Sequence, residues 1–424
     1  MKILHFSDTH VSHRRFRDVR DAWKISNRVT WIEEDYCLGF KKTLEIAAET
    51  DYDYVVHSGD LFDIPVGRYL AGPTEYSRTY VIKELKNFFE KTKYKVPVII
   101  IDGNHGSYLT RNYSTIEFIQ AAFPGNVYTF TNYQLKKAIL DNKPLKLEFD
   151  EVVFFLFPYF KFGRAPHIEK SYEEWLRNNQ QPDSSKISIA VAHGMQRGED
   201  LHSLLFDFSY DYVALGHDHK QGSTKTNAWQ SGSTEKHTFA ERGHTKGVLE
   251  VEVQKGEVPK VTPRKIETKR KMHQTNITLT TQTNPSDFEE IIREKIKAYK
   301  EKFAGESATR FKIKIDGSVL LSNWWSMEDI LLEIQQEVFT DAYNILEFRW
   351  DSYDLSKRAP ISHEKGAKIH EYLIDDPVDD FERYIRSLGL ENEDQARIFI
   401  DMGAQIIDEV FSGPIESTQE EEEE

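Results

Sequence analysis

The chain of 424 residues contains a single cysteine, Cys37, and has no apolar run near the ~20 residues that a membrane-spanning helix needs. One cysteine excludes a disulfide framework within the chain and favours a reducing cytoplasm. The N-terminal sequence MKILHFSDTH becomes polar after six residues, so no secretory signal is predicted there. We therefore expect a cytoplasmic protein that does not enter a membrane.

Basic side chains are also scarce: 55 Lys and Arg face 70 Asp and Glu, which gives a net charge of −15, and five acidic residues form the terminal run 420–424. This balance excludes tight, sequence-blind DNA binding through overall charge. It does not exclude a DNA enzyme in which bound divalent cations supply positive charge locally. Apolar residues make up 39% of the chain, enough for packed cores, and the length predicts two or three domains.

Short apolar runs alternate with longer amphipathic stretches in the first half of the chain. This pattern predicts an α/β or sandwich-like mixed domain. Residues 97–101 are apolar on both faces, which favours a central strand, and residues 80–91 have one apolar side, which favours a helix. A basic connector is predicted at residues 260–271. The predicted strands are Lys2–Phe6, Tyr54–Val56, Val96–Ile101, Val152–Phe157, Ile187–Ala192, Tyr212–Leu215 and Gly247–Val253.

A small α+β domain is predicted after the connector. The pair Asn284-Pro285 is typical of an N-cap followed by proline at the first helical position. Apolar residues alternate with cationic ones over residues 310–315, as in a half-buried strand. Ser326 and Asp329 resemble a capping box for a helix that ends near residue 338, and a further strand is expected at 345–350.

The last segment is predicted to be helical, with apolar stripes at residues 381–388 and 398–410. Two interpretations stay open: a helical hairpin packed on its own core, or an apolar face that binds a partner helix. The terminal glutamates are expected to form a solvated tail.

Five short polar motifs directly follow apolar strands. Ligand sites in α/β sheets gather at the carboxyl ends of strands, so the five segments can converge. Their carboxylate, imidazole and amide groups suit Mn, Fe or Zn rather than Ca or Mg alone. The paired residues at i and i+2 are expected to project the same way from an extended segment. The motifs are Asp8-Thr9-His10, Gly59-Asp60-Leu61-Phe62-Asp63, Gly103-Asn104-His105, His193-Gly194 and Gly216-His217-Asp218-His219.

The motif order D-x-H, GD-x-x-D, GNH, H-G, GH-x-H resembles that of the calcineurin-like metallophosphoesterases. Within that superfamily, the spellings SDTH, SGDLFD, ALGHDH and SGSTE followed by FAE resemble the SbcD family of DNA-repair nuclease subunits. The resemblance implies an α/β fold: a two-sheet sandwich flanked by helices, with a small α+β capping domain and a C-terminal helical tail. It divides the chain into a nuclease domain (1–270), a DNA-binding capping domain (271–355) and a partner-binding segment with the acidic tail (356–424).

The resemblance also implies two divalent metal ions, with Mn²⁺ favoured and Mg²⁺ or Fe²⁺ as alternatives. It implies that His105 contacts the scissile phosphate and helps the leaving oxygen depart. The family follows this histidine with aspartate, whereas Gly106 stands here, which leaves open whether His105 is a competent acid or Asp102 or Asp218 substitutes. The implied ligands are Asp8, His10 and His219 for one ion, Asn104, His193 and His217 for the other, and Asp60 as the bridge between them.

The implied activity is that of a manganese-dependent DNA endonuclease and 3′-to-5′ exonuclease. The implied partners are DNA and an SMC-like ATPase of the SbcC type, with a homodimer of this chain in a heterotetramer. Two alternatives are a metallophosphoesterase with another phosphodiester or phosphoester substrate, and a DNA-end-binding scaffold with weak catalysis.

The sequence also predicts the roles of an arginine cluster, two histidines and one aspartate outside the proposed ligand set. Arg14, Arg15 and Arg17 follow the first motif and are predicted either to contact DNA phosphates or to form a solvated helix face. His5 and His57 lie inside apolar strands and are expected in the core. Asp63 is expected to orient nearby backbone.

Overall fold

A computed structural model gives the structure of the chain. It describes residues 1–13, 29–63, 72–105, 114–160, 166–182, 184–195, 201–304, 309–339 and 345–358, together with residues 400 and 403. Two compact units divide the chain, residues 1–358 and 359–424. Arg14, Arg15, Arg17 and nearly all of the predicted helical tail lie outside the described residues. None of the described helices is both long and apolar enough to cross a bilayer.

Two six-stranded sheets form the first part of the chain, and the confirmed strand predictions supply most of their strands. Strands β1 to β4 run parallel in the first sheet, as do β6, β7, β8 and β10 in the second. The first sheet has the order β12 (Lys260–Lys265), β11 (Gly247–Glu252), β1 (Lys2–Phe6), β2 (Tyr54–His57), β3 (Val98–Ile101), β4 (Val127–Phe130). The second has the order β5 (Lys146–Glu148), β6 (Val152–Phe157), β7 (Ile187–His193), β8 (Tyr212–Gly216), β10 (Ala228–Gln230), β9 (Gly222–Lys225).

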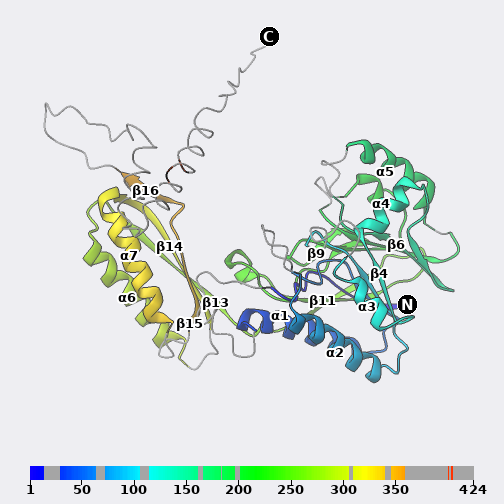
Figure 1. Cartoon of the computed structure of the whole chain (residues 1–424), viewed down its shortest axis with the longest axis horizontal. Coiled ribbons are helices and arrows are strands. Elements are labelled where there is room, and N and C mark those ends of the chain that lie inside the picture. The colour runs from blue at the N-terminus through cyan, green and yellow to red at the C-terminus, as the bar shows by residue number, and fades with distance from the viewer. Residues whose placement is uncertain are drawn as a thin grey trace, which may run out of the picture. The chain divides into compact units, whose positions relative to one another are not determined.

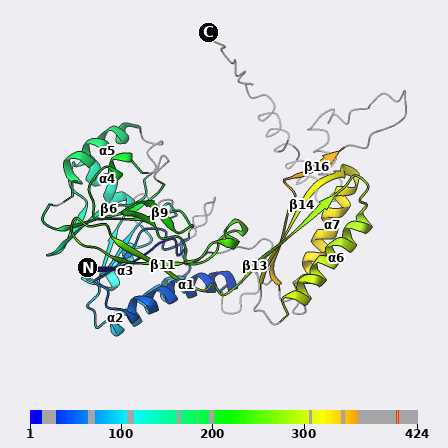
Figure 2. The same cartoon turned by 180° about the vertical axis from the view of Figure 1, so that it is seen from behind.

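Alternation along the strands places a core on each face of each sheet. In β1, Ile3 enters the core between the two sheets, whereas Leu4 and Phe6 enter the core under the helices. Helices α1 (Trp31–Glu49) and α2 (Glu75–Lys91) cover the outer face of the first sheet, and α4 (Asn132–Leu140) and α5 (Pro166–Asn179) that of the second (Figures 1 and 2). The result is the helix-flanked two-sheet sandwich predicted above.

Side-chain caps fix where the helices begin. Thr30 Oγ1 accepts a hydrogen bond from Glu33 N at 3.2 Å at the start of α1, and Thr131 forms a capping box with Gln134 at the start of α4. Helix α2 begins at Glu75, five residues before the predicted helix, because Thr74 caps it there. Short helices are α3 (Glu117–Ala122), η3 (Ser203–Phe206) and η4 (Phe239–Gly243).

Part of the predicted basic connector is a strand, so that prediction was wrong. Strand β12 pairs with β11 over six residues and forms the edge of the first sheet. Edge strands carry cationic side chains and tolerate proline, here Pro263, and this composition imitates a linker.

A third sheet with its own apolar core follows. Its strands, all in parallel pairs, are β13 (Met272–Leu279), β14 (Thr309–Leu320), β15 (Ile345–Asp351) and β16 (Leu355–Arg358). Helices α6 (Pro285–Lys302) and α7 (Leu321–Val338) cover one face of it (Figure 1). Asn284 caps α6 as predicted, because its Oδ1 accepts from Asp287 N at 2.9 Å.

The predicted capping box at Ser326 was wrong. Helix α7 follows β14 directly and begins at Leu321, so Ser326 lies inside the helix. Packing of Trp324 and Met327 into the third core holds this first part of α7 in place of a side-chain cap. The domain boundaries at residues 270 and 355 stay a prediction.

Candidate metal centre

The five polar motifs meet at one place. They follow the carboxyl ends of β1, β2, β3, β7 and β8, which are parallel within each sheet. Contacts then join the two sheets: His193 Nε2 lies 3.4 Å from Asp60 Oδ2, and His217 N donates to Asp8 Oδ2 at 3.0 Å. The structure thus brings all seven predicted ligands into one connected cluster.

The cluster has two halves that share Asp60. In one half, His10 Nε2 lies 3.2 Å from His219 Nε2, and these nitrogens lie 3.9 and 4.0 Å from Asp8 Oδ1. In the other half, Asn104 Oδ1 lies 2.9 Å from His193 Nε2 and 3.0 Å from His217 Nδ1. Asp60 Oδ2 lies 3.8 Å from His10 Nε2 and 3.4 Å from His193 Nε2.

Backbone strain is concentrated in the same residues. Asp8, His10, Asp60 and His217 have φ angles of 49°, 45°, 56° and 101°, so the expected extended segments were wrong. Each such non-glycine conformation costs roughly 1–3 kcal/mol and persists only where its surroundings fix it. Here the neighbouring loops fix it, since Asp8 N donates to Gly59 O and His10 N to Asp60 O, both at 3.0 Å.

Close approach explains two of the motif glycines. A Cβ atom on Gly59 would lie 2.1 Å from His193 Nδ1, and one on Gly103 would lie 2.0 Å from Asp60 Oδ1. Any side chain at either position would therefore displace a predicted ligand.

The donor set fits divalent cations. His193 Nδ1 lies 2.8 Å from Ser58 O and donates to it, so Nε2 turns its lone pair toward Asn104 Oδ1 and the Asp60 carboxylate. The His193 lone pair, the Asn104 oxygen and the Asp60 carboxylate are all hydrogen-bond acceptors, so a proton or a metal ion is needed between them. Burial acts to lower the pKa of His193, but the charge of Asp60 raises that pKa to about 9. The site therefore favours positive charge strongly, and its nitrogen and oxygen donors suit borderline transition metals.

Glu241 orients one of the imidazoles. Its Oε1 lies 3.2 Å from His219 Nδ1, which leaves Nε2 of that ring to face His10. Lys246, which is buried, holds the other oxygen of Glu241 at 2.6 Å. A carboxylate behind a histidine is the usual support of a metal-ligating ring. The sequence offered Glu241 only as part of the family resemblance.

Asp63 supplies the carboxylate that Gly106 lacks. His105 Nδ1 lies 2.5 Å from Asp63 Oδ1, so this carboxylate orients an imidazole. That it also orients nearby backbone stays a prediction. Burial acts to lower the pKa of His105, but the hydrogen bond with Asp63 raises it above its usual value. Asp102 instead accepts from Asn132 N at 3.1 Å, and Asp218 from Lys220 N at 2.9 Å. The side chain of His105 is 30% exposed, so a substrate can reach it.

His5 and His57 are buried in β1 and β2, as predicted. His5 bonds Tyr212 Oη and Ser58 Oγ, both at 2.8 Å, and His57 Nε2 lies 3.0 Å from Thr9 Oγ1. Burial lowers the pKa of each ring to about 3, so both are neutral near pH 7. Sequence reasoning missed a different imidazole, His237, which lies beside His10 and His219.

Comparison with known proteins yields a family and several relatives. The calcineurin-like phosphoesterase family matches residues 1–221. The chain is 25% identical over 329 residues to the SbcD subunit of the SbcCD nuclease of Staphylococcus epidermidis, a match that covers 70% of this chain and 75% of that one. It is 24% identical over 225 residues to "DNA double-strand break repair protein Mre11" of Sulfurisphaera tokodaii and 26% identical over 227 residues to the protein of that name of Saccharolobus solfataricus. These matches cover 51% and 52% of this chain and 49% of each archaeal chain, so the chain spans about half the length of those two relatives.

The matched residues contain the five motifs and the strands that carry them. The family match covers just over half of the chain, and its fold is the two-sheet sandwich described above. The chain belongs to the calcineurin-like phosphoesterase family and is a phosphoester hydrolase.

Proposed function

We propose that this chain is a DNA-repair nuclease of the SbcD type, a manganese-dependent endonuclease and 3′-to-5′ exonuclease. The observation that carries the proposal is the cluster of Asp8, His10, Asp60, Asn104, His193, His217 and His219. The relatives named as a nuclease subunit and as break-repair proteins support DNA as the substrate.

The difficulty of the reaction explains why such a cluster is needed. Uncatalysed phosphate-ester hydrolysis requires an acceleration on the order of 10¹⁷-fold or more, and general acid catalysis supplies only about 10²–10⁴ of it. Two divalent ions, if bound by these residues, would supply much of the remainder by neutralising negative charge and by activating a water molecule.

Each residue of the cluster has a part in this proposal. Asp8, His10 and His219 hold one ion, and Asn104, His193 and His217 hold the other. Asp60 joins the two halves, because a carboxylate has two oxygens to share and a charge that offsets both cations.

His105 would deliver a proton to the departing oxygen. Asp63 holds Nδ1, so Nε2 is the nitrogen that is left to face a substrate. The carboxylate also stabilises the protonated ring, which favours an imidazolium that can donate. This support weakens the case for a DNA-end-binding scaffold with weak catalysis, which depended on the missing aspartate at position 106.

The chain would work with partners in the cytoplasm. The staphylococcal relative is named as a subunit of a complex, which supports an SMC-like ATPase of the SbcC type as the companion and a homodimer of this chain within a heterotetramer. Residues 271–355 would act as the DNA-binding capping domain, residues 356–424 would bind the ATPase, and Arg14, Arg15 and Arg17 would contact DNA phosphates.

The test is cleavage of linear duplex DNA, labelled in turn at its 3′ and 5′ ends, by purified protein with Mn²⁺. We expect release of nucleotides from the 3′ end and no cleavage by an Asn104→Ala variant. Asn126→Ala is a matched control, because this amide is outside the cluster and donates to Tyr94 O at 3.2 Å. A preference for p-nitrophenyl phosphate over DNA would assign the site to another phosphoester. Bound Mn²⁺ without cleavage of either substrate would assign a scaffold.

A further inference from the structure

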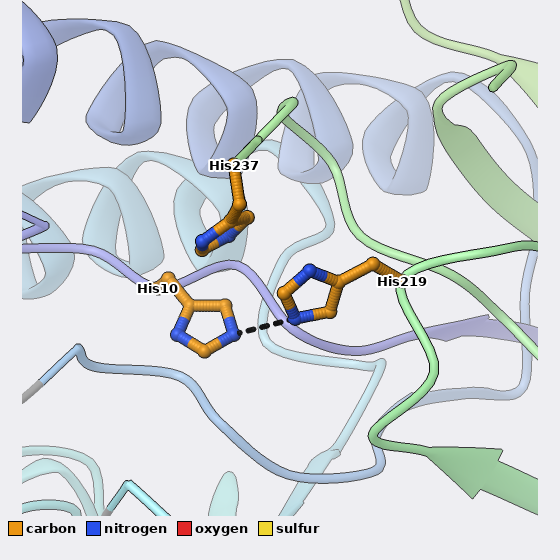
Figure 3. Close-up of side chains that lie close together, drawn as sticks. All are labelled: His10, His219 and His237. Carbon is orange, nitrogen blue, oxygen red and sulfur yellow. Dashed lines mark hydrogen bonds between the residues drawn. The ribbon is translucent and has the colours of Figure 1, made fainter. Parts of the chain in front are cut away.

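His237 adds a third imidazole to one half of the cluster. It stands between β10 and η4, and its ring centroid lies 4.3 Å from those of His10 and His219. Figure 3 shows the three rings gathered together, with the dashed line joining His10 to His219. One nitrogen of each ring lies within 4.8 Å of the other two.

The ring of His237 has an unsatisfied nitrogen. Its Nε2 is enclosed and has no hydrogen-bond partner among the described residues. A buried polar atom without a partner is costly, and a role in ligand binding is one reason for a protein to retain it.

We propose that His237 is a third imidazole ligand of the ion held by His10 and His219. This inference rests on the metal assignment of the proposed function and adds a residue to it. Two nitrogens that each bind one ion at about 2.1 Å are at most about 4.2 Å apart. The three ring nitrogens lie within 4.8 Å of one another, so their separations would have to shrink by less than about 1 Å for all three to bind the same ion. A third nitrogen makes this ion site softer than its neighbour, which retains two imidazoles beside the amide and carboxylate oxygens.

A purely structural role for His237 would rest on its other contacts. Its ring meets those of Tyr36 and His13, with centroids 4.8 and 5.2 Å away. Such packing needs a flat ring but no polar nitrogen, so it does not explain why Nε2 is buried without a partner among the described residues.

The backbone of His237 is held from the third sheet. Arg310 of β14 donates to Lys236 O at 2.7 Å and to His237 O at 3.1 Å. Its Nε also donates to Glu347 Oε2 of β15 at 2.5 Å, and both side chains are buried. Arg310 is thus a positioning residue, which fixes the segment that carries the third ring.

The experiment counts the imidazoles that bind metal. Full-length protein labelled with ¹⁵N-histidine is stripped of metal and loaded with ¹¹³Cd²⁺ alone, and NMR detects the ring nitrogens that couple to cadmium. We expect five coupled rings in the unaltered protein and four in a His237→Gln variant. His244→Gln is the matched control, since it lies in the same segment outside the cluster and is expected to keep all five.

The outcomes separate this inference from the proposed function. Four coupled rings in the unaltered protein, with none lost in His237→Gln, would overturn the role of His237 and leave the metal centre intact. No coupled ring would overturn the metal centre itself. The count in the unaltered protein decides the matter even if His237→Gln fails to fold.

The same proposal predicts a change in metal preference. The apparent dissociation constant for Co²⁺, measured calorimetrically, should rise by about tenfold or more in His237→Gln, a magnitude seen even when only the supporting partners of metal ligands are lost. Mg²⁺ binding should change less, because Mg²⁺ prefers oxygen ligands. Equal losses for the two ions would contradict a nitrogen ligand at this position.

Discussion

The two-sheet region of residues 1–265 and the single-sheet region of residues 272–358 fill their interiors differently. In the two-sheet region, carboxylates and imidazoles are buried at the strand ends, and all eight described non-glycine residues with positive φ lie there. In the single-sheet region, the core is apolar, and its buried polar side chains among the described residues are Thr309, Arg310 and Glu347. Strain and buried charge thus accompany the candidate chemistry, as is common at functional sites.

This contrast predicts that substitutions in the two regions will affect different properties. In the two-sheet region, a change that preserves shape should remove activity. In the single-sheet region, a change that creates a cavity should lower the free energy of unfolding. The segment that Arg310 holds is where the two regions should depend on each other.

The largest effect is expected for Asp60→Asn. Asparagine keeps the shape of aspartate and tolerates the left-handed backbone at this position, so the fold should persist. The negative charge of the proposed bridging ligand is lost, and kcat for phosphodiester hydrolysis with Mn²⁺ should fall by at least about 10³-fold. Steady-state kinetics measure this change.

Asp53→Asn provides the control, because Asp53 precedes the same strand at its other end and accepts from Lys2 N. Its kcat should equal that of the unaltered protein. A comparable loss of kcat in both variants would mean that activity reports general damage to the strand and not the site.

The next effect is expected in the core of the third sheet. Leu331 of α7 is 0% exposed, whereas its neighbour Leu332 is 47% exposed. Leu331→Ala should lower the free energy of unfolding by about 2–5 kcal/mol, and Leu332→Ala should change it by less than about 0.5 kcal/mol. Urea denaturation followed by fluorescence measures both.

The same pair of variants tests the separation of the two regions. Both should bind Mn²⁺ with unchanged affinity in native buffer, because neither residue contacts the cluster. Weaker Mn²⁺ binding by Leu331→Ala alone would show that the metal centre depends on the packing of the third core and would contradict the contrast.

The sequence predicted those features that depend on local pattern. Continuous apolar runs predicted the strands, and polar motifs at their ends predicted the seven clustered residues, because parallel strands bring their carboxyl ends to one edge. Strand β12 was not predicted, because an edge strand that contains cationic residues and proline has the composition of a linker. The start of helix α7 was also mispredicted, because tertiary packing and not a side-chain cap determines where this helix begins.

The residues that orient the predicted ligands and His105 could not be predicted, because each of their contacts joins residues that are far apart in the sequence and meet only in the fold. Asp63 reaches His105 across 42 positions, and Glu241 reaches His219 across 22. His237 has no local signal at all, since nothing in its sequence neighbours indicates that its ring faces His10, 227 positions away. The left-handed backbone at Asp8 and Asp60 is likewise a product of the neighbouring loops.

The smallest effect, a change in Mn²⁺ affinity, is expected for a double variant at Arg310 and Glu347, where the two regions meet. By contrast, replacing only one partner would take a short ion-pair contact from the other buried charge and would destabilise the protein by about 3–5 kcal/mol. The double variant Arg310→Met with Glu347→Leu removes both charges at similar volume and should lower the free energy of unfolding by less than either single replacement. It also removes the two hydrogen bonds that hold the carbonyls of Lys236 and His237. Mn²⁺ affinity should therefore fall, by up to about tenfold, because the lost contact acts one step behind the proposed ligand.

Calorimetric titration of the double variant with Mn²⁺, beside urea denaturation of the metal-free protein, separates the two effects. A further variant, Lys312→Met with Asp351→Leu, removes the neighbouring half-buried ion pair of the same strands, which does not contact the segment of His237, and should leave Mn²⁺ affinity unchanged. Equal affinity in all three proteins would mean that β14 holds this segment without influencing the metal centre. A weaker affinity for the Arg310 variant alone would show that the third sheet, none of whose described residues belongs to the cluster, helps to set the geometry of the site.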